Sequence, residues 1–401
     1  MSATVARSPV DVEKRPSLPP LWLMLTMLWL VAAALRISIL AIPPLLPAIH
    51  RDLGLSETLV GVLSSLPIIL LAAAAVPGSF IIARVGAKRS LMLGLCIVVV
   101  AGAARGIGSS IPVLFAMTLV MSVGIAISQP ALPSLVRDWL PDRAGMATAV
   151  YSNGFLFGEI LPVALTVPLV LPLVGGHWQG ALLLWSAPIA LAALTLLAAP
   201  PSFQPPGLPS RWWPDWRSGR TWLLGGILGC GSIGYFSTNA FLPDFLRATH
   251  HADLISAALT CLNVGQLPAS VLVGLIPGHL VGRRWPVIGC GVIMVVSALI
   301  MSSSGLLTVI FAGTLGFASA LIFILSLALA PMLAEEGDAH RLSAAMFTIS
   351  YACAAAGSLG AGALWDASGA PLSALAPVLV AGVLMIGLAF RINASTRAAL
   401  R

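Results

Sequence analysis

Three charged residues lie inside long apolar stretches of the chain: Arg36, Arg105 and Glu159. A charge at the centre of a bilayer costs about 2.5–3.5 kcal/mol on insertion scales, so it normally faces a cavity or a partner. The guanidinium of Arg36 can donate paired hydrogen bonds to a planar anion. Glu159 is the one acid deep in such a stretch, and pairing would allow both charges to be buried.

Two interpretations of Arg36 stay open, contact with an anionic substrate and a purely structural pairing with Glu159. Glu159 is also the candidate carrier of a coupling proton. Arg105 is interpreted mainly as structural or as reaching toward the membrane surface.

Neutral polar side chains accompany these charges and predict a second, uncharged wall of a binding site. Asn263 and Gln266, three residues apart, share one helix face. For each of these neutral polar residues, a hydrogen bond between helices is the plainer interpretation. The candidate set is Gln129, Asn153, Tyr235, Asn239, Asn263, Gln266 and Tyr351. With Arg36 and Glu159 they suit a small anion, or an acid with an apolar, hydrogen-bonding body.

Enzyme chemistry finds no support in the motifs. The six histidines are scattered and the five cysteines have no paired spacing. No metalloprotease, serine-hydrolase or P-loop motif is present. We therefore expect no cofactor, no metal and no catalytic residue.

The elements that hold these residues are membrane helices. The chain has 401 residues, of which 58% are hydrophobic and 9% charged, whereas soluble domains carry about 25% charged residues. Apolar runs of about 20 residues predict spanning helices. The predicted fold is an all-α polytopic membrane protein with twelve spans, at 21–49, 57–83, 90–109, 112–136, 144–172, 179–200, 221–246, 254–281, 285–304, 306–333, 342–364 and 371–391.

Basic residues predict the orientation. Seventeen of the 21 Lys and Arg fall on the side of the N-terminus, and only Arg51 and Arg247 fall on the other. Because cytoplasmic loops are enriched in Lys and Arg, both termini are predicted in the cytoplasm of a multi-pass protein of the bacterial inner membrane. The net charge of +7 then reflects topology and not nucleic-acid binding. The lipid bilayer and a small-molecule substrate are the expected partners of a monomer.

The two halves of the chain resemble each other. Under a shift of 196 residues, "LPAIHRDLGLSETLVGVL" lies over "LPDFLRATHHADLISAAL" without a gap. Such parallel six-span repeats describe a known transporter plan in which substrate binds between the halves. The predicted organisation is a tail at 1–20, a bundle at 21–200, a linker at 201–220, a bundle at 221–391 and a tail at 392–401.

This plan resembles the major facilitator superfamily, whose loop between the second and third spans carries a basic signature. Here "SFIIARVGAKR" and "GHLVGRRW" place in register Arg84, Gly86, Lys88, Arg89, Gly282, Arg283 and Arg284. The first span, "ALRISILAIPPLLPAIHRDLGLS", is similar to the cyanate and nitroimidazole permease branch, which has a Leu-Arg pair followed by Pro-Leu-Leu-Pro. The resemblance implies alternating access between two bundles with pseudo-two-fold symmetry and a gating role for the basic loops.

The expected function is secondary transport of a small organic or inorganic anion, such as a cyanate-, nitrite- or carboxylate-like solute. The alternative is a proton-coupled exporter of drugs or nitroaromatic compounds. Gly154 and Gly158 partly match a drug-antiporter motif of the superfamily, but Glu159 stands where that motif has Pro. A receptor of transporter shape and a membrane enzyme are the remaining alternatives.

Overall fold

The computed structural model describes residues 19–55, 57–200, 212–303, 305–334 and 339–392, and within these ranges the chain forms helices and their connections. Most of both predicted tails and half of the predicted linker lie outside these ranges. The elements of the first half are α1 (Leu21–Leu40), η1 (Pro43–Leu45), α2 (Leu46–Leu53), α3 (Glu57–Val85), α4 (Ala87–Ala104), α5 (Ile111–Ser128), α6 (Ala131–Trp139), η2 (Pro141–Arg143), α7 (Ala144–Leu165), η3 (Thr166–Val170), α8 (Leu171–Leu173) and α9 (Trp178–Leu197). Those of the second half are α10 (Gly219–Ala248), η4 (Ala252–Leu254), α11 (Ile255–Val264), α12 (Leu267–Leu275), α13 (Pro277–Leu280), α14 (Arg284–Met301), α15 (Leu306–Leu333), α16 (Ala339–Ser368), η5 (Pro371–Leu375) and α17 (Ala376–Ala389).

Eleven stretches of the described residues are long and apolar enough to cross a membrane. The protein is therefore an all-helical, multi-pass membrane protein. Helix α10 covers the predicted seventh span with 30 residues but is not one of the eleven. Its sequence carries Gly, Ser, Thr and Asn along its length, which reduces its mean hydropathy.

Three of the predicted spans are interrupted close to a proline. The first is interrupted at 41–42, before Pro43, and the fourth at 129–130, at Pro130 itself. The eighth is interrupted at 265–266, before Pro268. Proline has no backbone N–H and its ring clashes with the preceding turn, so the helix breaks there. The breaks in the fourth and eighth spans place Gln129 and Gln266 at helix ends inside the molecule.

The prediction for the third span was too long. Helix α4 ends at Ala104, and Arg105 lies at its C-terminal cap instead of within the helix. The residues after it, up to Ser110, form turns.

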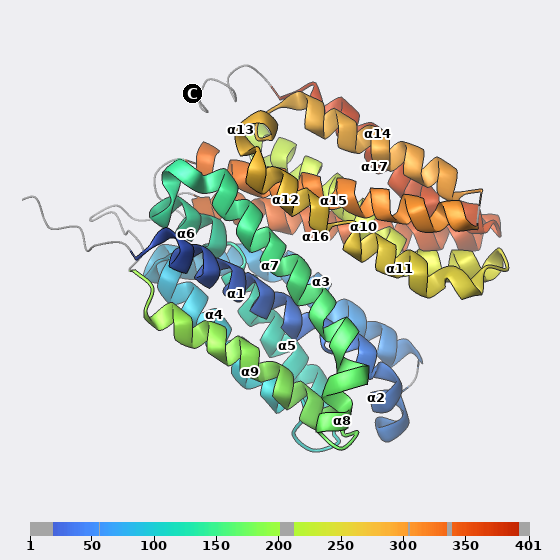
Figure 1. Cartoon of the computed structure of the whole chain (residues 1–401), viewed down its shortest axis with the longest axis horizontal. Coiled ribbons are helices and arrows are strands. Elements are labelled where there is room, and N and C mark those ends of the chain that lie inside the picture. Colours follow the sequence, from blue (N-terminus) through green and yellow to red (C-terminus); the bar gives the residue numbers. More distant parts are fainter. Residues whose placement is uncertain (1–18, 56, 201–211, 304, 335–338, 393–401) are drawn as a thin grey trace, which may run out of the picture.

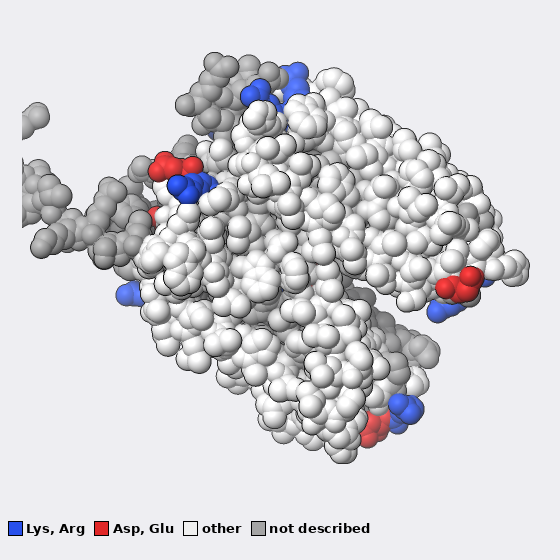
Figure 2. Space-filling model, in the orientation of Figure 1, with Lys and Arg blue, Asp and Glu red and all other residues white. Residues whose placement is uncertain are grey.

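Figure 1 shows the helices of the first half, coloured blue to green, grouped apart from those of the second half, coloured yellow to red. Contacts between the groups join α3 to α16, α7 to α12 and α15, and α6 to α15 and α16. Several of these lie at the end of the molecule that carries α6 and α13. Toward the end that carries α2, α8 and α11 the groups diverge (Figure 1), and a notch separates them there in the space-filling view (Figure 2).

Small residues let α1 and α7 pack closely, which determines where the embedded charges meet. A Cβ atom on Gly154 would lie 2.4 Å from the carbonyl oxygen of Trp29, and one on Gly158 would lie 2.3 Å from that of Ala33. Only glycine fits such a backbone approach, as expected for a GxxxG pair. Arg36 and Glu159 follow directly along the same interface.

Charged side chains on the face shown in Figure 2 lie at the two ends of the molecule, with a broad uncharged band between them. Large apolar side chains such as Val100, Leu183 and Leu194 are 61–68% exposed. An uncharged band with exposed apolar residues is the surface that lipid requires.

Candidate functional site

The centre of the site is an ion pair between α1 and α7. Arg36 Nε lies 3.3 Å from Glu159 Oε1, and the two side chains are 8% and 11% exposed. The pair does not have hydrogen-bond geometry at Nε. The Arg36 guanidinium lies 5.1 Å from the centre of the Phe155 ring, within range of a cation–π contact.

Tyr351 on α16 ties the arginine to the second half of the chain. Arg36 Nη2 donates a hydrogen bond of 3.2 Å to the Tyr351 hydroxyl. Gln129, at the break between α5 and α6, donates from Nε2 to the same oxygen at 3.0 Å. Tyr351 is buried and its ring stacks on Phe347. Both hydrogen bonds come from the first half of the chain, so they tie the Tyr351 hydroxyl of the second half to the first.

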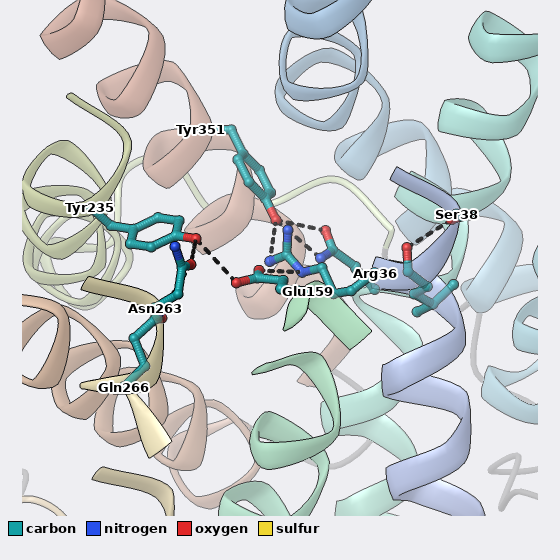
Figure 3. A network of polar contacts seen from close by, with 9 residues as sticks. Arg36, Ser38, Glu159, Tyr235, Asn263, Gln266 and Tyr351 are labelled. Carbon is teal, nitrogen blue, oxygen red and sulfur yellow. Dashed lines mark hydrogen bonds and ion pairs between the residues drawn. The ribbon is translucent and has the colours of Figure 1, made fainter. Parts of the chain in front are cut away.

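Tyr235 on α10 makes the second link between the halves. Its hydroxyl donates to Asn263 Oδ1 at 2.8 Å and lies 3.3 Å from Glu159 Oε2. One hydroxyl has a single proton, so the longer contact to Glu159 is the weaker one. Gln266 Nε2 adds a contact of 3.4 Å to Asn263. Figure 3 shows this network converging on the Arg36–Glu159 pair.

Two cavities meet at this network. An outer cavity of about 550 Å³ lies between the two halves and reaches Pro43, Asn239 and Ser358. An inner cavity of about 50 Å³ lies among α7, α10, α15 and α16. The residues that line both are Arg36, Glu159, Tyr235 and Phe236. These four side chains therefore form the partition between a wide vestibule and a small inner pocket.

The structure brings seven of the nine predicted substrate residues into one network: Arg36, Gln129, Glu159, Tyr235, Asn263, Gln266 and Tyr351. Asn239 lines the outer cavity outside this network. Asn153 lies elsewhere, because it accepts a hydrogen bond from Trp29 Nε1 and donates one to Ser270 Oγ. Its position indicates a structural link between α1, α7 and α12.

Arg105 does not reach toward the membrane surface. It is 2% exposed, and its Nη2 donates a hydrogen bond of 2.9 Å to the carbonyl oxygen of Ser38, near the end of α1. A cation there is favourable because the last carbonyls of a helix carry partial negative charge. This contact links Arg105 to α1, and Arg105 also lines the outer cavity.

The basic loop residues lie where each half turns between two helices. Gly86 and Gly282 both have positive φ, 84° and 73°, which favours glycine. Lys88 donates to the carbonyl oxygen of Ala199, and Arg284 donates to that of Ile392. Arg89 and Arg283 are exposed. Arg84 is also exposed, and its guanidinium lies over the ring of Phe80.

Several lining residues were missed by the sequence analysis, namely Ser152, Phe155, Ser232, Phe236, Ser319, Phe323 and Ser350. A signal was present for four of them. Ser152, Phe155 and Glu159 recur at intervals of three and four along α7, and Ser232, Tyr235 and Phe236 do the same along α10. Such spacing places residues on one helix face.

Comparisons with known proteins agree with this architecture. The model of the Major Facilitator Superfamily matches residues 28–224. The uncharacterized transporter YycB of Bacillus subtilis is 26% identical over 355 residues, covering 86% of this chain and 87% of that protein. The 2-nitroimidazole transporter of Escherichia coli is 27% identical over 346 residues, covering 85% and 87%. The cyanate transport protein CynX of Escherichia coli is 26% identical over 262 residues, covering 64% and 67%.

Solved structures show the same fold. The transporter FucP in its outward conformation superposes with a TM-score of 0.68 at 15% identity, covering 93% of this chain and 98% of FucP. The human organic anion transporter MFSD10 superposes with a TM-score of 0.71 at 16% identity, covering 94% and 100%. Residues 28–224 thus match the major facilitator superfamily, and the chain as a whole resembles membrane transporters that include the cyanate and 2-nitroimidazole transporters.

Proposed function

We propose that the protein is a secondary active transporter that moves a small organic or inorganic anion across the bacterial cytoplasmic membrane. The substrate class is cyanate-, nitrite- or carboxylate-like. The relatives named above are transporters, which supports transport over catalysis. The excess of basic residues on one side supports cytoplasmic termini.

Transport follows from alternating access of two six-helix bundles, at 21–200 and 221–391, with α10 as the seventh of twelve crossings. Equivalent contacts in the two halves, from Lys88 to Ala199 and from Arg284 to Ile392, support the repeat. The halves meet at the end with α6 and α13 and diverge at the other. The vestibule therefore faces the outside, and the protein works as a monomer without a cofactor.

The observation that carries the proposal is the unused hydrogen-bonding capacity of Arg36. Arginine has five N–H donors. Within the described residues, Arg36 uses one of them in a hydrogen bond, from Nη2 to Tyr351, while its Nε has none. A guanidinium with free donors, at the floor of a vestibule, is suited to bind a planar anion.

Glu159 makes anion binding change the ion pair at the centre of the site. An anion that binds Arg36 competes with the carboxylate at 3.3 Å and releases it. The released carboxylate can strengthen its contact with Tyr235 or take up a proton from the vestibule. The second option couples anion movement to a proton gradient, with Glu159 as the proton carrier.

A second candidate, export of nitroaromatic compounds, is favoured by the aromatic lining of the inner cavity. Its rings are Phe155, Tyr235, Phe236, Phe323 and Tyr351. Flat rings stack well on such side chains. The direction of transport separates this candidate from anion uptake.

The test is uptake of labelled cyanate, nitrite, formate and benzoate into proteoliposomes, with and without a pH step. Arg36→Ala is expected to abolish uptake while the protein still inserts into the membrane. The control is Arg247→Ala, which removes an exposed arginine paired with Asp244 and should leave uptake unchanged. Full uptake by Arg36→Ala would refute the anion site, and flux of nitroaromatics out of inverted vesicles would support export.

A further inference from the structure

The inner cavity carries a ring of serine hydroxyls that the proposed mechanism does not use. They come from four helices, as Ser152 on α7, Ser232 on α10, Ser319 on α15 and Ser350 on α16. The oxygens of Ser232 and Ser350 lie 2.6 Å apart and hydrogen bond to each other. Both halves of the chain thus contribute hydroxyls to one small space.

The other two hydroxyls have no hydrogen-bond partner among the described residues. Ser152 and Ser319 are 1% and 4% exposed, and their Oγ atoms are buried and unpaired. A buried polar group without a partner is destabilising, by about 1–3 kcal/mol. Groups retained at that cost require an explanation.

Five other buried serines among the described residues behave differently. Ser90, Ser122, Ser128, Ser186 and Ser343 each donate to the backbone carbonyl four residues earlier. That bond satisfies the hydroxyl inside its own helix. Ser152 and Ser319 lack it, so two residues that line the cavity each keep an unused hydroxyl donor.

The inner cavity holds about 50 Å³, enough for three to five water-sized groups at roughly 10–15 Å³ each. Because Arg36 lines both cavities, a group in the inner cavity lies directly behind an anion bound at the arginine.

We infer that the inner cavity receives the neutral, hydrogen-bond-accepting end of a flat solute whose anionic end binds Arg36. The inference rests on the proposed function and narrows its substrate class. Ser152 and Ser319 donate to the acceptor, while Phe155, Phe236 and Phe323 contact the flat body of the solute. A solute with both groups is held more tightly than an anion with an apolar far end.

Isonicotinate and benzoate test this, because they share shape and charge and differ only in a ring nitrogen opposite the carboxylate. Dissociation constants are measured by calorimetry on the purified protein near neutral pH, where the nitrogen is an acceptor. Wild type is expected to prefer isonicotinate by about 2- to 10-fold, the value of one net hydrogen bond. Equal binding of isonicotinate and benzoate would overturn this inference but not the anion site, because a pocket filled only by water does not distinguish the two probes.

Serine variants test whether Ser152 and Ser319 cause the preference for isonicotinate over benzoate. The double variant Ser152→Ala, Ser319→Ala is expected to bind both probes with the affinity of benzoate, and its melting temperature should not fall, because the hydroxyls are unpaired. The control Ser122→Ala, on α5 at a residue that lines neither cavity, should keep the preference. A preference that survives the double variant would overturn the inference, as would failure of wild type to bind either probe. Only failure to take up cyanate and nitrite as well would also overturn the anion site.

Discussion

Replacing Glu159 by Gln is expected to tighten anion binding and to slow transport. The substitution keeps the shape of the side chain and an oxygen for Tyr235, but removes the charge that competes for Arg36. A substrate anion would then no longer have to displace a carboxylate at 3.3 Å. The return of that carboxylate, which helps to expel the anion, would also be lost.

The magnitude follows from the geometry. Two opposite unit charges 3.3 Å apart attract by about 5 kcal/mol at an effective dielectric constant of about 20. Desolvation of both groups offsets most of this attraction. A remainder of about 1–3 kcal/mol corresponds to 5- to 150-fold tighter binding. The uptake rate at saturating substrate should fall by a similar order, because release becomes the slow step.

The assay combines calorimetric binding of nitrite and benzoate with uptake into proteoliposomes. The matched control is Asp244→Asn, which also removes one negative charge but from a pair that is 57% and 63% exposed. Its affinity should stay within twofold of wild type, since exposed pairs contribute little. Unchanged or weaker anion binding by Glu159→Gln would refute the competition between Glu159 and substrate.

Two further predictions concern stability. Gly158→Ala places a Cβ atom 2.3 Å from the carbonyl oxygen of Ala33, so we expect a loss of about 1–3 kcal/mol, seen as a lower melting temperature. Gly360→Ala, where a Cβ atom meets nothing within 4 Å, should not lower it, and equal effects of the two substitutions would contradict the close packing of α1 and α7. Hydrogen bonds from Trp178, Ser109 and Gln179 hold the pKa of Asp52 below its ordinary value. Because the folded-state pKa is depressed, the stabilisation is present above about pH 4 and is lost as the pH falls further. Asp52→Asn should therefore show a smaller drop in melting temperature between about pH 5 and pH 3 than wild type, measured by thermal unfolding, and parallel curves would exclude this role.

The helices, and the embedded charges that needed a partner, followed from the sequence alone. Apolar runs identify membrane helices because lipid leaves the backbone no other way to satisfy its hydrogen bonds. The same physics singled out Arg36 and Glu159, since a charge in hydrocarbon is too costly to leave unpaired. Their ion pair in the structure connects positions 123 residues apart.

The tertiary structure decided which face of each helix points inward and which polar side chains become hydrogen-bond partners. A helix that is apolar on all sides gives little periodic signal for its inward face, so the serines around the inner cavity could not be separated from those that bond within their own helix. The contact of Tyr351 with Gln129 joins residues 222 positions apart, and Asn153, similar in chemistry, instead links α1, α7 and α12. Which polar groups meet depends on helix rotation and on the breaks at Gln129 and Gln266, and these are determined by packing between helices that are distant in the chain.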